Sequence, residues 1–400
     1  MKITAVDIIQ LPSNPLITST FCRIHTDEGI YGYGESGVAL DHYSNASREL
    51  LKVFAELIIG MDPLENDVIF NKLYQMFWAQ GNGLVIMSAI SAIDVALWDI
   101  KGKYHNVPIY KLLGGKHRDK VRAYASQLQF GWRPETMTYS ASTLPKLKES
   151  CLRALDDGYD AVKINFVSKN EAGENLRYEN LKNYIQPDLM RLFVNRVKTA
   201  RETLGPDVDI IVENHGLTSA GTTIQFARAI EEMNIMYLEE PTNPLNPHEY
   251  RRIADKTCIP LATGERIALR WAFLPLLENR SLSVVQPDLG ICGGITEAMK
   301  IATLADAYGA KVQIHACNSP ISIAASLQVE AALSNFIIHE VHVFNVMPEI
   351  VEQGVYDYQP ENGYITVPDL PGLGNELSEK ALSEATIITI NQGRSGKSLI

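Results

Sequence analysis

The chain has 400 residues, of which 46% are hydrophobic and 21% are charged, and its formal net charge at pH 7 is −11. Nucleic acid and anionic membrane surfaces need clustered Lys and Arg, so this acidic balance argues against both as main partners. No apolar run reaches the roughly 18 residues of a membrane span, and the five cysteines form no CxxC pair. A reduced, cytoplasmic protein without a disulfide framework is therefore expected.

The first 120 residues predict an α+β domain. Residues 3–11 and 19–36 read as strands, the second range turning back on itself at Asp27-Glu28-Gly29. Apolar residues at three- and four-residue spacing then predict helices over 44–60, 63–78 and 85–106. The stretch "YGYGE" within the second range contains a GxG, but no helix follows it, so we interpret these glycines as structural.

From residue 121 short β-branched runs alternate with helical patterns. The eight runs are 121–126, 160–166, 208–215, 235–241, 259–265, 282–288, 310–316 and 335–341. Alternating strands and helices at this pitch predict a parallel β/α barrel. A doubly wound open sheet is the alternative, but it usually carries a glycine fingerprint after its first strand, and "VRAYASQLQFGW" has none.

Polar residues stand at the ends of seven of these runs. They are Lys163 and Asn165, Glu213 and His215, Glu239, Glu265, Asp288, His315 and Glu340. From Glu213 onward one of them recurs every 23 to 27 residues, which is about one strand-helix unit. Because the active site of a β/α barrel opens at the carboxyl ends of its strands, we expect these residues to occupy equivalent places around one rim.

Three of the strand ends carry carboxylates on consecutive strands, Glu213, Glu239 and Glu265. Converging carboxylates repel one another unless a cation lies between them. Mg²⁺ prefers carboxylate oxygens and keeps open positions for water or substrate. The spacing thus predicts a Mg²⁺ site formed by these three residues, the alternative being salt bridges to neighbours such as Arg266.

Asp288 and His315 come from the next two strands. A carboxylate that holds an imidazole fixes its tautomer and raises its basicity, as a general base requires. His215 shares a strand face with Glu213 and should lie across the mouth from His315. This pattern predicts acid–base chemistry with two histidines, beside the metal.

Several segments together resemble the enolase superfamily, in its mandelate racemase and sugar-acid dehydratase branch. The similar segments are "MSAISAIDVALWDIKGK", "PIYKLLGG", "YLEEP", "ATGER", "QPDLGICGGITEAMKIA" and the "HA" of the seventh strand. The resemblance implies an α+β capping domain over a (β/α)7β barrel, with Mg²⁺ at the third, fourth and fifth strand ends. The implied domains are a cap over 1–120, a barrel over 121–370 and a segment 371–400 that returns toward the cap. The common chemistry of the family is removal of a proton next to a carboxylate, giving an enediolate.

The third strand end, "ENH", resembles that of galactonate-type dehydratases. The resemblance implies that His315, oriented by Asp288, removes the C2 proton of a galactonate- or gluconate-like acid and that His215 protonates the departing C3 hydroxyl. It also implies substrate contacts for Lys163, Asn165 and Glu340. Asn165 stands where racemases of the family carry a second, basic lysine, so racemisation through that position is not expected. Glu213 departs from relatives that carry Asp there.

The leading hypothesis is therefore a Mg²⁺-dependent sugar-acid dehydratase that yields a 2-keto-3-deoxy acid, forms a homo-oligomer and serves carbohydrate acid catabolism. Two alternatives stay open: an epimerase or cycloisomerase of the same superfamily, and a barrel that binds sugar acids without turning them over. The first-domain loop 15–19 is expected to close the mouth. The long polar insertion 167–191 could place Arg177, Tyr178 or Tyr184 at the far end of the substrate, and a solvated surface excursion is the alternative.

Overall fold

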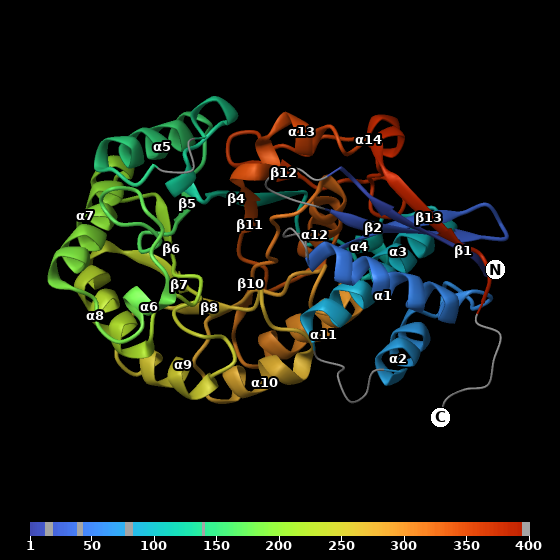
Figure 1. Ribbon diagram of the computed structural model, residues 1–400, viewed down its shortest axis with the longest axis horizontal. Helices are drawn as coiled ribbons and strands as arrows, with labels where there is room; N and C mark the ends of the chain where they lie inside the picture. Colours follow the sequence, from blue (N-terminus) through green and yellow to red (C-terminus); the bar gives the residue numbers. More distant parts are fainter. Residues whose placement is uncertain (13–18, 38–42, 77–82, 138–140, 394–400) are drawn as a thin grey trace.

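Both ends of the chain contribute to the antiparallel sheet of the capping domain. The computed structural model describes residues 1–12, 19–37, 43–76, 83–137 and 141–393. The sheet order is β13-β1-β2-β3. Its strands are β1 (Ile3–Gln10), β2 (Thr20–Thr26), β3 (Tyr31–Ser36) and β13 (Thr386–Ile390). The late strand β13 thus returns from the barrel to pair with β1, as Figure 1 shows at the right.

Three helices cover one face of this sheet: α1 (Tyr43–Ile58), α2 (Asn66–Met76) and α3 (Leu84–Tyr104). Helix α3 packs directly on β3, because Gly32 and Gly34 leave no side chain between the two backbones. A Cβ at Gly34 would collide with the carbonyl of Ala92 in α3. The glycines of "YGYGE" therefore serve close packing of a helix on a strand.

The second part of the molecule is a ring of parallel strands in the order β10-β9-β8-β7-β6-β5-β4-β11. Their bounds are β4 (Lys120–Ser126), β5 (Ala161–Ile164), β6 (Asp209–Glu213), β7 (Ile235–Glu239), β8 (Leu261–Thr263), β9 (Val284–Val285), β10 (Lys311–Val312) and β11 (His339–His342). A parallel bridge between Val312 and Phe336 joins β10 to the chain just before β11 and closes the ring. The expected (β/α)7β barrel with a capping domain is confirmed.

Helices surround the ring on the outside (Figure 1). The long ones are α5 (Leu144–Asp156), α7 (Pro187–Leu204), α8 (Ala220–Ile230), α9 (Pro247–Ala254), α10 (Arg270–Glu278), α11 (Gly294–Ala307) and α12 (Pro320–Ala332). Short elements complete the chain: α4 (Ile109–Leu112), α6 (Tyr178–Leu181), α13 (Pro348–Val351), β12 (Tyr364–Thr366) and α14 (Glu379–Glu384). Within the described residues no helix combines the length and apolarity needed to cross a membrane.

Alternation along the strands builds the barrel interior in layers. One apolar cluster fills the interior: Tyr124, Ala161, Ile211, Tyr237, Ala262, Val284 and Ile338, with Met236 and Ile337 packed against it. Two residues further along six of the seven strands that supply this cluster stands a polar side chain: Ser126, Lys163, Glu213, Glu239, Gln286 and Glu340. At the end of β8 the corresponding residue is Gly264. The apolar layer is thus a floor, and the polar layer above it faces the mouth.

The cap and barrel meet beside this mouth. Gly37, just after β3, donates its N–H to the carbonyl of Gly290 at 2.9 Å. Buried Glu35 accepts hydrogen bonds from the hydroxyls of Ser319 and Ser322 at the start of α12. Asp94 of α3 accepts the N–H and hydroxyl of Thr296 near the start of α11. These contacts fix the cap over the loop that carries Asp288.

The structure differs from the sequence-based expectations in detail. Helix α7 begins at Pro187, so the polar insertion is shorter than the expected 167–191. Strands β9 and β10 span only two residues each, although seven-residue runs were expected. The expected mouth loop 15–19 lies outside the described residues except for Ser19.

Candidate active site

Glu213 and Glu239 end neighbouring strands and are register partners in the sheet. Glu213 accepts the N–H of His215 on Oε1 at 2.5 Å, whereas its Oε2 is buried without a hydrogen-bond partner. Glu239 has both oxygens engaged, Oε1 by the ammonium of Lys163 at 2.6 Å and Oε2 by the amide of Gln286 at 2.7 Å. Burial raises the pKa of both carboxyls. Lys163 lowers the pKa of each, whereas the proximity of Glu213 raises that of Glu239 further.

Glu265 reaches the mouth by a different route from the other carboxylates. Its strand, β8, ends at Thr263, and the register partner of Glu239 is Ala262 rather than Glu265. Strict alternation from Ala262 would turn Glu265 outward. Gly264 has φ +155°, and a Cβ there would lie 2.6 Å from the backbone of Gln286, so only glycine allows this turn. The expectation of equivalent rim positions is therefore wrong for Glu265, because the strand ends early.

Lys163 lies fully enclosed at the centre of the polar layer. Its Nζ is 2.6 Å from Glu239, 2.8 Å from Glu340 and 3.6 Å from Glu213. Glu340 also accepts the hydroxyl of Ser126 at 2.6 Å. Although burial opposes ionisation of Glu340, Lys163 and His315 lower its pKa below its usual range. This network keeps Lys163 and Glu340 charged away from water.

Asp288 and His315 form the pair that the sequence predicts. They are joined by a parallel bridge, and Asp288 Oδ2 is 2.8 Å from His315 Nδ1. His315 Nε2 then faces the mouth, 3.4 Å from Glu265 and 3.9 Å from Glu340. Burial alone would lower the pKa of His315, but neighbouring Cys317, Glu265 and Asp288 raise it well above its ordinary value. The His315 ring is thus held through Nδ1, and its raised pKa makes Nε2 strongly basic.

His215 follows β6 with a left-handed backbone, φ 48°, and its side chain is 37% exposed. Its Nδ1 lies 2.8 Å from Asn165 Nδ2, and its Nε2 lies 3.8 Å from Glu213 Oε2. Glu265 lies close to His215 and Glu213. Each of these three residues offers a possible ligand atom within 4.8 Å of the other two. The two histidines therefore stand at one mouth, with Glu265 near each of them.

The donor set at this mouth fits a hard divalent cation. The buried Oε2 of Glu213 lacks a hydrogen-bond partner, with Lys163 the nearest cation at 3.6 Å, and carboxylates are the ligands that Mg²⁺ prefers. Glu213 and Glu265 lie together as expected, with His215 beside them. Glu239, the third expected ligand, is the register neighbour of Glu213, and its oxygens contact Lys163 and Gln286 in this structure. Which oxygens complete a cation site stays a prediction.

Cys317 and Ser126 are residues of this site that sequence reasoning missed. Cys317 is near enough to His315 to affect its pKa, and Ser126 binds Glu340. Both could have been found by continuing the two-residue alternation one step past His315 and along β4. The spacing of the five cysteines bears only on a disulfide framework and gives no sign of this contact.

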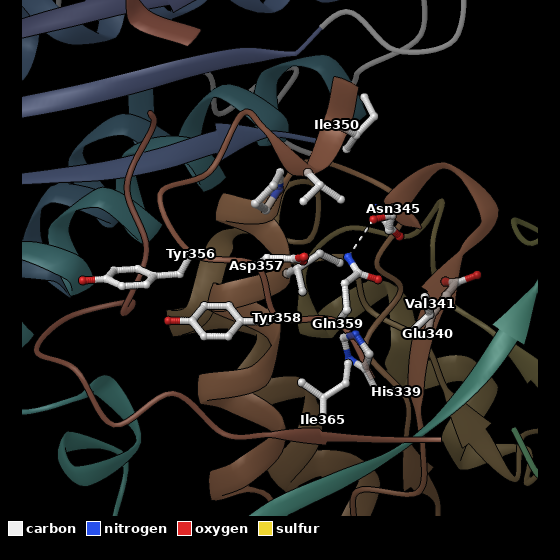
Figure 2. A pocket seen from close by; sticks show the side chains of 13 residues that line it. His339, Glu340, Val341, Asn345, Ile350, Tyr356, Asp357, Tyr358, Gln359 and Ile365 are labelled. Atoms are coloured by element: carbon white, nitrogen blue, oxygen red, sulfur yellow. Dashed lines mark hydrogen bonds between the residues drawn. The ribbon is translucent and has the colours of Figure 1, made fainter. Parts of the chain in front are cut away.

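A small cavity lies elsewhere, between β11, α12, α13 and residues 356–359. Figure 2 shows that the carboxylate of Glu340 points away from the other side chains that line it. Gln359 donates to the carbonyl of Asn345 there, at 3.0 Å. The polar groups of the mouth are therefore not part of this cavity's chemistry.

Comparisons with known proteins agree with this geometry. Residues 15–114 match the model of the mandelate racemase / muconate lactonizing enzyme N-terminal domain, and residues 146–381 match that of the enolase C-terminal domain-like family. A curated D-galactonate dehydratase from Variovorax paradoxus is 33% identical over 92% of this chain and 90% of its own length.

Solved structures are also similar over nearly the whole chain. A member of the enolase superfamily from Salmonella Typhimurium is 45% identical, with a TM-score of 0.94 over 97% of this chain and 99% of that chain. The 3,6-anhydro-D-galactonate cycloisomerase of Zobellia galactanivorans is 26% identical, with a TM-score of 0.81 over 96% and 99%.

Proposed function

The chain belongs to the enolase superfamily, in its mandelate racemase and muconate lactonizing enzyme branch, and from this we propose that it is a Mg²⁺-dependent dehydratase of a galactonate- or gluconate-like sugar acid. Membership in this enzyme family, with relatives named as dehydratases, supports a hydro-lyase and speaks against a barrel that only binds its ligand. The single observation that carries the proposal is the pair of histidines at one mouth, His315 held by Asp288 and His215 beside Glu213.

The two histidines divide the reaction between them. His315 removes the C2 proton through Nε2, because Asp288 holds the other ring nitrogen. His215 protonates the hydroxyl that leaves C3, so that water departs and the resulting enol becomes a 2-keto-3-deoxy acid. Lys163 and Glu340, which lie side by side in the polar layer, contact the substrate's carboxylate end and hydroxyls.

A divalent cation held by Glu213 and Glu265, with Glu239 as the third ligand, would offset the second negative charge that develops on the substrate carboxylate. The chain's own residues then have two tasks. Glu213 and Glu265 keep negative charge at the mouth, and the apolar floor excludes water from beneath it.

The test is a screen of aldonic and aldaric acids with Mg²⁺, read out as 2-keto product with semicarbazide. We expect product with at least one acid of galacto or gluco configuration. If no acid in a broad library gives 2-keto product, although C2 protons exchange with solvent, the dehydratase proposal fails.

An epimerase or cycloisomerase is the second candidate, because the cycloisomerase from Zobellia galactanivorans shares the fold over nearly the whole chain. His215→Asn separates the two. In a dehydratase this variant should retain C2 proton exchange and lose dehydration by roughly 10²-fold or more, the contribution of a general acid. An inverted C2 centre or a ring-opened isomer as the wild-type product would favour the second candidate.

A further inference from the structure

Asn165 occupies the position where two-base members of the family carry a lysine, and its side chain contacts His215. We propose that Asn165 is a positioning residue that keeps the proton of the neutral His215 ring on Nε2, the nitrogen that faces the mouth.

The orientation of the Asn165 amide follows from its other contact. The backbone N–H of Val167 donates to Asn165 Oδ1 at 3.1 Å. A backbone N–H is only a donor, so this atom must be the carbonyl oxygen, and the atom on the far side must be the NH₂ group. That NH₂ group lies 2.8 Å from His215 Nδ1.

The tautomer of His215 follows from this orientation. An amide NH₂ has only hydrogens to offer, so His215 Nδ1 must accept through its lone pair. A neutral imidazole has one N–H and one lone pair, which places the hydrogen on Nε2. Nε2 is therefore a donor toward the mouth, near Glu213 Oε2.

The contacts of Asn165 also hold its side-chain amide in this orientation. It is 3% exposed, and its backbone N–H donates to Gln129 Oε1 at 3.0 Å. Gln129 is held in turn by Gln127, and the hydroxyl of Ser168 donates to the carbonyl of Asn165. A flipped amide would leave the buried N–H of Val167 facing hydrogens, which disfavours the flip.

This tautomer determines how His215 meets a ligand. With hydrogen on Nε2, His215 donates to the lone pairs of a hydroxyl oxygen, and it has no lone pair on that nitrogen for a cation. His215 would then differ from Glu213 and Glu265, with which it forms a compact donor cluster. The catalytic consequence rests on the proposed function: the neutral ring must first take up a second proton on Nδ1, for which the Asn165 amide moves away, and the resulting imidazolium gives its Nε2 proton to the departing hydroxyl. The tautomer of the resting ring does not rest on that function.

The direct test is ¹⁵N NMR of histidine ring nitrogens in the full-length protein, with the His215 signals assigned by their absence in His215→Asn. Spectra are recorded about two pH units above the ordinary imidazole pKa of ~6.5, where free rings are neutral. We expect an unprotonated-type shift for Nδ1 and a protonated-type shift for Nε2, unchanged when Mg²⁺ alone is added. A proton on Nδ1, or loss of the Nε2 proton on adding Mg²⁺, would overturn the proposal.

Variants give a second readout. Asn165→Asp presents a carboxylate, which accepts from an N–H, so the proton of His215 should move to Nδ1. Asn170→Asp is the matched control, because Asn170 bonds Glu174 in the same segment and should leave the His215 shifts unaltered. An Asn165→Asp spectrum identical to the wild type would contradict the assignment.

A third variant, Asn165→Leu, separates this proposal from the proposed function. With an active substrate, Asn165→Leu should lower dehydration by up to about 10²-fold while C2 proton exchange persists. Equal loss of both would indicate a merely structural role. If no sugar acid is dehydrated, the NMR result still decides the tautomer.

Discussion

At the scale of single residues, His315 is the group on which the proposed proton transfer depends. Its Nδ1 is bound to Asp288 and its Nε2 is directed at the mouth. His315→Asn should abolish exchange of the substrate C2 proton with solvent deuterium, a loss of about 10²–10⁴-fold or more. Proton NMR of the substrate in D₂O measures it.

The matched control is His248→Asn, which changes an exposed histidine of α9. It should exchange the C2 proton at the wild-type rate. If exchange persists in His315→Asn, His315 is not the base.

Glu213 is the residue through which the cation prediction can be tested without any substrate. Its Oε2 is buried without a hydrogen-bond partner. A cation bound to this oxygen would compensate for its lost hydration and so stabilise the folded protein. Mg²⁺ at 100 times its dissociation constant should stabilise the folded wild type by about 2.7 kcal/mol. Thermal unfolding with and without Mg²⁺ measures this, and Glu213→Gln should lose most of the increment.

Glu330→Gln serves as a comparison, because this buried carboxyl pairs with His339 away from the mouth. It should keep the Mg²⁺-dependent increment, even if its baseline stability is lower. An equal Mg²⁺ effect in Glu213→Gln and the wild type would remove Glu213 as a ligand.

At the scale of elements, the connection between β5 and α7 is held by one buried side chain. Arg196 of α7 is 3% exposed and donates to the carbonyls of Ser142, Phe166, Lys169 and Asn170. Leu181 and Ile185 are buried under the rest of the segment. The polar segment that follows β5 is thus anchored at its start by Arg196 and near its end by Leu181 and Ile185.

Arg196→Met should therefore destabilise the protein by about 3 kcal/mol, because it leaves buried carbonyls without donors. Urea unfolding measures the loss, and limited proteolysis should show new cleavage within residues 167–186. Arg191→Met, on the same helix, removes an exposed arginine and should leave both unchanged. Unaltered proteolysis in Arg196→Met would show that the segment is held by its apolar residues alone.

At the scale of the whole molecule, the junction of cap and barrel contains a buried carboxyl that makes stability depend on pH. Burial raises the pKa of Asp94 from 3.8 to about 7, although Thr296 opposes this. In the unfolded chain an Asp titrates near ~3.9. Between these values the folded chain holds a proton that the unfolded chain has lost, so stability falls as pH rises from about 4 to about 7.

The amide of Asp94→Asn cannot ionise, so the variant should not show this loss of stability with rising pH. Relative to the variant, the wild type should lose on the order of 4 kcal/mol across that window, at about 1.4 kcal/mol per pH unit. Urea unfolding at several pH values measures the difference. Asp207→Asn, which removes an exposed carboxylate, should show the same pH dependence of stability as the wild type. If Asp94→Asn loses stability with rising pH as steeply as the wild type does, Asp94 is not the group responsible.

The sequence alone was sufficient to predict the barrel, its cap and the strand ends whose polar side chains meet at the mouth. Hydrophobic periodicity and βα spacing depend on residues that are near one another in the chain, so they can be read from the sequence without the tertiary structure. The pairing of Asp288 with His315 could be predicted because their strands are neighbours in the chain and in the ring.

Only the tertiary structure decided which atoms meet across the ring. Lys163 binds Glu239 and Glu340 from strands far apart in the chain, and Asn165 reaches His215 through its NH₂ group. Glu265 enters the mouth because Gly264 breaks the alternation of β8. Such contacts depend on strand register, strand length and side-chain direction, which arise only when the barrel closes and brings distant residues within hydrogen-bonding distance.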